Sequence, residues 1–147
     1  MNSFFNDLFD YNYYCNKLII EAALEHPKFP DKAAVLFNHI LNAHQIWNAR
    51  ILHTETPSNF WQRNEPINWE EIHYDNQRTT FGILTDKNDF EEEIVFTNTE
   101  NEVLQSSLKK ILFHIINHST YHRGQIATLM RTQNIEPIAT DYTYYKN

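Results

Sequence analysis

The chain has 147 residues, of which 41% are hydrophobic and 14% aromatic, enough apolar material for the core of one domain. Its 19 acidic and 12 basic residues give a formal charge of −7, which disfavours contact with phosphate backbones, so we expect no nucleic-acid partner. Two glycines and five prolines are too few for the turns of a many-stranded sheet, so the composition favours long helices.

The sequence also indicates where the protein works. No apolar run approaches the roughly 18 residues that a membrane-spanning helix needs, so we expect no membrane association. The first residues, MNSFFNDLFDYNYY, lack the basic start and apolar centre of a signal peptide. Cys15 is the single cysteine, which cannot form an internal disulfide and is typical of a reducing compartment. These features predict a cytoplasmic protein.

The first half of the chain predicts two helices, over residues 2–25 and 32–52, because apolar residues recur there at helical spacing. Pro27 and Pro30 separate the two helices, since proline disfavours helix continuation, and Asp31 is expected to cap the second. In the second helix the apolar residues follow one another at steps of three and four: Leu36, Ile40, Ala43, Trp47 and Ile51.

The second half predicts a loop over residues 53–68, a third helix over 68–84 and a final helix over 106–132. Between the last two helices, short β-branched or apolar runs around Val95 and Val103 flank a polar turn, which predicts a hairpin. The expected fold class is therefore all-α: a four-helix bundle with a small β-hairpin in the crossover before the last helix.

Three of the eight histidines, His114, His118 and His122, stand at successive steps of four in the final helix. With an advance of about 100° per residue, His122 falls within the apolar arc of this helix and His118 at its rim. His114 is turned further towards the polar side. Two imidazoles spaced four residues apart can converge on one ion, the spacing used in helix-borne zinc motifs.

A third ligand has to come from another helix, and His39 is the candidate because it lies among Val35, Ala43 and Ile46 on the apolar side of the second helix. His44 is about 140° away from His39 around that helix, so the two cannot share a site. An inward-facing histidine is also common as a hydrogen-bonded core residue, so spacing alone leaves both interpretations open. Our hypothesis is one divalent metal ion bound by His39, His118 and His122.

Other patterns are less specific. Glu70-x-x-His73 resembles half of a di-iron carboxylate site, but only one such motif is present, so we interpret it as surface charge. Ser119 follows His118 where zinc proteases carry a general-base glutamate, which argues against protease chemistry. Glycine destabilises a helix interior, so Gly124 has two possible explanations. Another helix or subunit approaches closely at this position, or the glycine is simply tolerated there. The C-terminal tyrosines are expected to pack the tail down: Tyr142, Tyr144 and Tyr145.

Three segments together resemble the DinB/YfiT-like family of metal-dependent bacterial proteins. They are HIINHSTYHRGQIATLMR at 114–131, followed by Pro137 and Thr140-Asp141; LFNHILNAHQIWNARI at 36–51; and YNYYCNKLI at 11–19. The resemblance spans most of the chain and implies a single domain over residues 1–147. It also implies an up-down-down-up bundle, usually a homodimer, with a zinc or nickel ion on His39, His118 and His122.

The better-understood relatives that this resemblance implies are bacillithiol and mycothiol S-transferases and a mycothiol-dependent maleylpyruvate isomerase. We therefore expect a metal-dependent enzyme that activates a low-molecular-weight thiol for transfer to a small electrophile, because a metal-bound thiol loses its proton. Candidates for orienting the ligands or lining the pocket are Asn38, His114, Tyr121 and Asp141. Two alternatives stay open, a metal-dependent hydrolase of a small substrate and a bundle that the ion merely stabilises.

Overall fold

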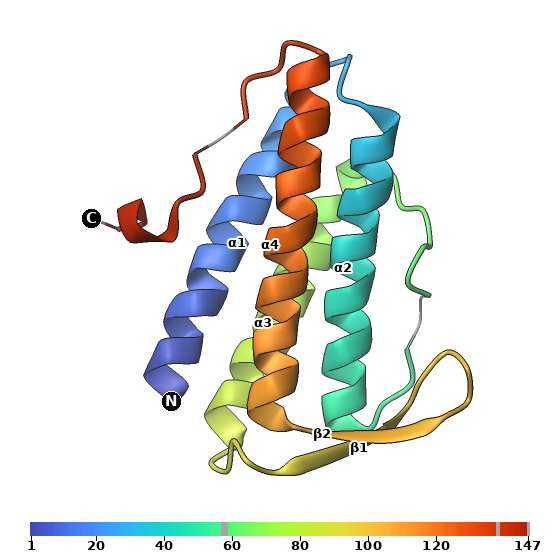
Figure 1. The fold of residues 1–147 in the computed structure, drawn as a ribbon, viewed down its shortest axis with the longest axis vertical. Helices are drawn as coiled ribbons and strands as arrows, with labels where there is room; N and C mark the ends of the chain where they lie inside the picture. Colours follow the sequence, from blue (N-terminus) through green and yellow to red (C-terminus); the bar gives the residue numbers. More distant parts are fainter. Residues whose placement is uncertain (57–58, 138, 147) are drawn as a thin grey trace.

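A computed structural model describes residues 1–56, 59–137 and 139–146. These described residues form four α-helices: α1 (Asn2–Glu25), α2 (Asp31–Leu52), α3 (Trp69–Asp86) and α4 (Leu108–Thr132). In Figure 1, α1 and α4 run upward while α2 and α3 run downward, so the predicted up-down-down-up bundle is confirmed. None of the described helices has an apolar stretch long enough to cross a membrane.

The link between α1 and α2 follows from its prolines. Helix α1 ends at Glu25, and Pro30, with an extended backbone at φ −62° and ψ 136°, immediately precedes α2. The prediction that Asp31 caps α2 is wrong, since Asp31 is already helical and makes no side-chain capping bond. Its carboxylate instead accepts a bond from Arg63 Nη2 at 3.0 Å, where the acid also complements the positive end of the helix dipole.

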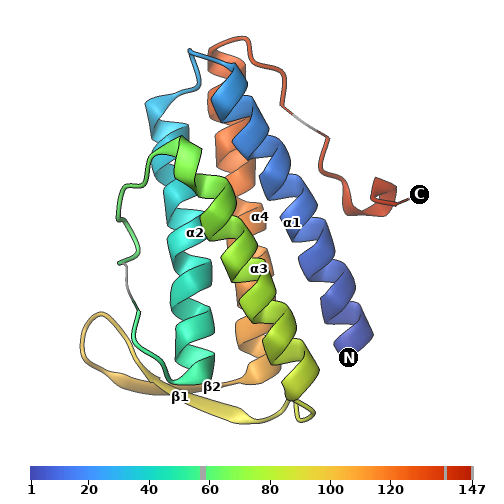
Figure 2. The same ribbon diagram turned by 180° about the vertical axis from the view of Figure 1, so that it is seen from behind.

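The predicted hairpin is confirmed: β1 (Glu93–Thr97) pairs antiparallel with β2 (Val103–Ser107), with Val95 opposite Gln105. The Asn98 side chain accepts bonds from the backbone N–H groups of Glu100 and Glu102, both at 2.9 Å, which holds the turn. Seen from behind in Figure 2, the hairpin lies across the end of the bundle and connects two antiparallel helices. The crossover that returns along the bundle is instead the link between α2 and α3.

The interior has two apolar clusters separated by a belt of buried polar side chains. One cluster contains Phe9 and Leu112 and lies towards the hairpin; the other contains Phe37 and Trp69 and lies towards the opposite end. Each helix contributes to the belt between them: Asn12, Asn16, His44, Asn48, His73, Asn76, Gln77, Thr80, Ser119 and Arg123. The belt is hydrogen-bonded across helices, which offsets much of the cost of burying it. Among the described residues, three of its buried atoms have no hydrogen-bond partner: Asn12 Nδ2, His73 Nδ1 and Gln77 Oε1.

Gly124, on the exposed side of α4, is not explained by close packing within the chain. Apart from its chain neighbours and the adjacent backbone of α4, a Cβ atom built at this position meets no atom of the described residues within 4 Å. The explanation by another helix of the same chain is therefore wrong for the described residues, and an approaching subunit or simple tolerance remains.

Candidate metal centre

The three predicted ligands come together where α2 packs beside α4. His39 lies on α2, and His118 and His122 lie one turn apart on α4, on two helices that stand side by side in Figure 1. Their candidate ligand nitrogens all lie within 4.8 Å of one another, and the Nε2 atoms of His39 and His118 are 3.0 Å apart. Two nitrogens bound to a tetrahedral zinc ion lie about 3.3 Å apart, so this group could hold a metal ion.

The hydrogen bonds of two of these rings fix which nitrogen is free. His39 Nδ1–H donates to the backbone carbonyl of Phe60 at 2.9 Å, since a carbonyl oxygen can only accept. His122 Nδ1 lies 2.7 Å from Gln125 Oε1, which likewise accepts a proton from the ring. When neutral, each ring therefore carries its proton on Nδ1 and its lone pair on Nε2. The lone pair of His39 accepts a hydrogen bond from His118 Nε2 at 3.0 Å, a position that a metal ion could take. Metal-ligating histidines show this pattern, in which the second nitrogen is tied to an oxygen.

Electrostatics favour the neutral form of the site. Burial, followed by repulsion from His39, His122 and His114, lowers the pKa of His118 to about 3. Burial also lowers the pKa of His39, although its bond to the Phe60 carbonyl opposes this. These two imidazoles are therefore neutral at pH 7, the form that binds metals. Because the triad contains no carboxylate or thiolate, a bound divalent ion would keep its full charge.

The segment that orients His39 is the return loop after α2. Asn42, one turn beyond His39, donates from Nδ2 to the carbonyls of Gln62 at 2.8 Å and Phe60 at 3.4 Å. The Trp61 ring stacks on the His39 ring with centroids 3.9 Å apart and an interplanar angle of 7°. Asn42, Phe60 and Trp61 were missed in the sequence. Asn42 carried one usable signal, its spacing of three residues from His39 on the same helix.

The predicted residue Asn38 belongs to the same loop contact and not to the triad. Its Oδ1 accepts bonds from the Asn64 backbone N–H at 2.9 Å and from Trp69 Nε1 at 3.3 Å. Its Nδ2 donates to the Ala34 carbonyl one turn earlier. Asn38 therefore anchors the far end of the loop whose other part supports His39.

The other three predicted residues lie at different distances from the triad. His114 lies next to His118, with ring centroids 5.6 Å apart, and meets Trp47 edge-on at 5.2 Å. Tyr121 is 64% exposed and meets His122 edge-on at 5.1 Å. Asp141 lines a separate hollow with Tyr11 and Cys15, where none of the triad histidines is found. The structure thus groups His114 and Tyr121, but not Asp141, with the triad.

The C-terminal segment around Asp141 packs against α1 as expected. Tyr11 contacts Tyr142 edge-on with ring centroids 5.0 Å apart, and Tyr14 contacts Tyr145 at 5.1 Å. The prediction that the C-terminal tyrosines hold the tail down is confirmed for Tyr142 and Tyr145.

Two further histidines are core residues. His44 Nε2 lies 2.7 Å from Thr80 Oγ1, so His44 faces α3 and is separate from His39, as predicted. His73 is 1% exposed, donates from Nε2 to the Tyr13 carbonyl at 3.1 Å and stacks on the Tyr13 ring. The interpretation of Glu70-x-x-His73 as surface charge is therefore wrong for His73, because the tight packing of α3 on α1 buries it.

The loop contact leads to a prediction about metal affinity. Asn42→Ala removes the side chain that holds the loop carbonyls in place, so His39 loses its fixed orientation. We expect metal affinity to fall about tenfold, the lower end of the range typical for residues that support metal ligands. Competition with a chromophoric chelator measures this affinity. Asn6→Ala, which removes one exposed amide bond to Asn2 on α1, is the matched control and should change nothing. Equal affinity in the two variants would contradict this role.

These features together define a helical bundle with a three-histidine group between two of its helices. Residues 24–147 match the model of the DinB family, and the chain therefore belongs to the DinB family. It is also 23% identical, over 164 residues, to "Protein DinB" of Bacillus subtilis (strain 168), covering 99% of this chain and 95% of that protein. No solved structure gave a significant match.

Proposed function

We propose that this protein is a metal-dependent enzyme that activates a low-molecular-weight thiol for transfer to a small electrophile. The observation that supports it is the convergence of three imidazoles, two of which form a hydrogen bond from Nδ1 to an oxygen. His118 and His122 are only partly buried, so solvent and small molecules can reach this point. The ion would be zinc or nickel, since imidazole ligands suit both.

The chemistry follows from the donor set. His39, His118 and His122 would hold a divalent ion, which would supply a Lewis acid that favours the thiolate form of a thiol. The chain's own residues would contribute orientation: Phe60 and Gln125 fix two of the rings, and Asn42 fixes the loop that carries Phe60. The thiol sulfur forms a bond to the electrophilic carbon, the leaving group departs with its electron pair, and the thiol proton passes to solvent.

Three parts of the proposal rest on the family resemblance and on general chemistry. A homodimer would place the exposed Gly124 face of α4 near another subunit. A cytoplasmic location would supply reduced thiols. Neither a nucleic acid nor a membrane is required, and small molecules are the proposed partners.

Turnover assays test this function. Zinc-loaded and nickel-loaded protein should accelerate conjugation of cysteine or glutathione with 1-chloro-2,4-dinitrobenzene, and His118→Ala should return the rate to background. Metal-dependent cleavage of 4-nitrophenyl acetate without any thiol would favour a hydrolase, the second use of the same three histidines. If neither reaction is accelerated and metal removal lowers the melting temperature steeply, the ion has only a stabilising role.

A further inference from the structure

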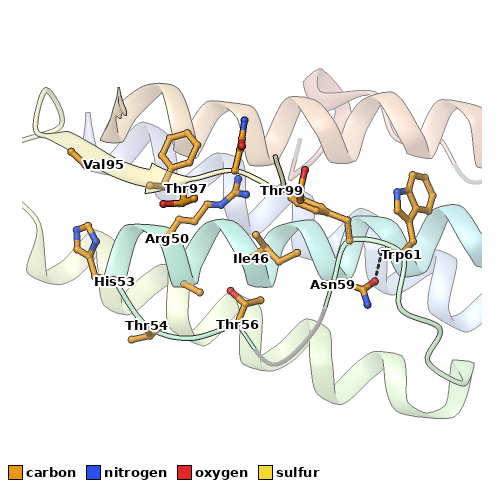
Figure 3. A pocket seen from close by; sticks show the side chains of 14 residues that line it. Ile46, Arg50, His53, Thr54, Thr56, Asn59, Trp61, Val95, Thr97 and Thr99 are labelled. Atoms are coloured by element: carbon orange, nitrogen blue, oxygen red, sulfur yellow. Dashed lines mark hydrogen bonds between the residues drawn. The ribbon is translucent and has the colours of Figure 1, made fainter. Parts of the chain in front are cut away.

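A pocket of about 830 Å³ opens beside the metal centre, between the C-terminal half of α2, the return loop and the hairpin. Figure 3 shows Ile46 and Arg50 extending from α2 into the space below β1, with Trp61 on the loop that follows α2. The size is within the range of about 300–1,000 Å³ typical of pockets for small molecules. Apolar walls are supplied by Ile46, Phe60, Trp61 and Phe96.

Arg50 places a positive charge in this pocket. Its guanidinium carbon lies 4.5 Å from the ring centre of Trp47, 5.0 Å from that of Phe96 and 5.5 Å from that of Phe60. These cation–π contacts hold the charge in place without using its N–H donors, which point along the plane of the group. Burial lowers the pKa of Arg50, but arginine remains charged at neutral pH.

None of the carboxylates that the structure describes forms an ion pair with this guanidinium. In residues 1–56, 59–137 and 139–146, none of the ion pairs includes Arg50, although the chain has 19 acidic residues. The described residues that line the pocket contain no aspartate or glutamate. In a chain of formal charge −7, this pocket is therefore a local site suited to an anion. A carboxylate matches the planar fork of a guanidinium through two parallel hydrogen bonds.

The pocket adjoins the metal centre through Phe60 and Trp61, which line the pocket and contact His39. Trp61 lines the pocket and also stacks on His39, with ring centroids 3.9 Å apart. The guanidinium carbon of Arg50 lies 5.5 Å from the ring centre of Phe60, and the His39 ring centre lies 6.0 Å from it, so the two groups are less than about 12 Å apart. A small organic acid is therefore long enough to reach from Arg50 to the triad.

We propose that this pocket binds the carboxylate end of a small organic acid, with the carboxylate on Arg50, the apolar body against Phe60, Trp61 and Phe96, and the opposite end at the histidine triad. The inference rests on the proposed function in one respect, that the acid is a reactant of the metal centre. Binding at Arg50 itself requires no metal, which makes the two claims separable.

The test compares an acid with its neutral amide. The probes are 4-phenylbutyrate and 4-phenylbutanamide, which have the same apolar body, and calorimetric titration gives each dissociation constant. Wild-type protein should bind the acid at least about tenfold more tightly than the amide, within the range for a charge-assisted bidentate contact. Arg50→Met should make the two constants equal, and Arg50→Lys should retain part of the preference. The matched control Arg78→Met, at an exposed arginine of α3, should retain all of it.

Equal binding of acid and amide by wild-type protein, or an unchanged preference in Arg50→Met, would overturn the inference. A variant that merely loosens the fold would weaken both probes together, so the ratio of the two constants separates that effect. The same titrations on metal-free protein and on His118→Ala should show the acid preference intact. Loss of the preference there would place the acid on the ion and refute Arg50 as its partner. An intact preference without thiol transfer would instead refute only the proposed reaction.

Discussion

His118→Ala should weaken metal binding by more than about 100-fold, beyond the 10–100-fold cost of losing a residue that only supports a ligand. The reason is geometric, because His118 Nε2 on α4 lies 3.0 Å from His39 Nε2 on α2, so one ion could bind both nitrogens. His122→Ala should have the same effect, since an ion with only two histidine ligands has water at most of its remaining coordination positions. Metal analysis after equilibrium dialysis against zinc or nickel measures both variants.

His26→Ala and His53→Ala are the controls, since neither histidine belongs to the triad. Both should retain one ion per chain. Circular dichroism should show that the His118→Ala bundle remains helical, because His118 is only half-buried and lies outside the two apolar clusters. Unchanged stoichiometry and affinity in both His118→Ala and His122→Ala would refute the assignment.

Mild acid should destabilise the metal-free bundle strongly, and two core histidines should account for a large part of the effect. Burial lowers the pKa of His44 to about 3, and burial likewise lowers the pKa of His73 to about 4. Above pH 6.5 these histidines are neutral in the folded and the unfolded chain, so their protonation does not lower the free energy of unfolding. As the pH falls below 6.5 the unfolded chain binds protons that the folded chain cannot, so each histidine reduces stability by about 1.4 kcal/mol per pH unit. At pH 4.5 the combined loss is on the order of 5 kcal/mol.

Urea unfolding between pH 7.5 and pH 4.5, with a chelator present throughout, measures this loss. His44→Gln should lower stability at pH 7 but reduce the steepness of the decline between pH 6.5 and pH 5. His26→Gln, at the exposed end of α1, should leave the steepness unchanged. A free energy of unfolding that stays constant from pH 7 to pH 5 would show that the buried histidines do not control acid stability.

Helical periodicity was sufficient to predict most of the fold. Apolar steps of three and four identified the first, second and last helices, a less regular pattern identified the third, and Pro27 and Pro30 marked the first break. The same periodicity placed His39, His118 and His122 on inward faces, because a helix fixes the direction of each side chain about its axis. The convergence of the three rings could therefore be expected once α2 and α4 were taken to be neighbours.

The parts that were missed depend on contacts between segments without a repeating pattern. The return loop places Phe60 and Trp61 against His39 through the side-chain bonds of Asn38 and Asn42, which no periodicity encodes. Asp141 lies in an irregular segment that folds onto α1, so its position could not be derived from a helical wheel. His73 was misjudged because its burial depends on how closely α3 packs on Tyr13.

X-ray absorption spectroscopy of zinc-loaded protein tests most directly whether His39, His118 and His122 share one ion. We expect one zinc per chain, with a scattering pattern of three imidazoles at about 2.0–2.1 Å and at least one exchangeable oxygen ligand. A protein that retains no zinc, or whose zinc is surrounded by fewer than two imidazoles, would contradict the assignment.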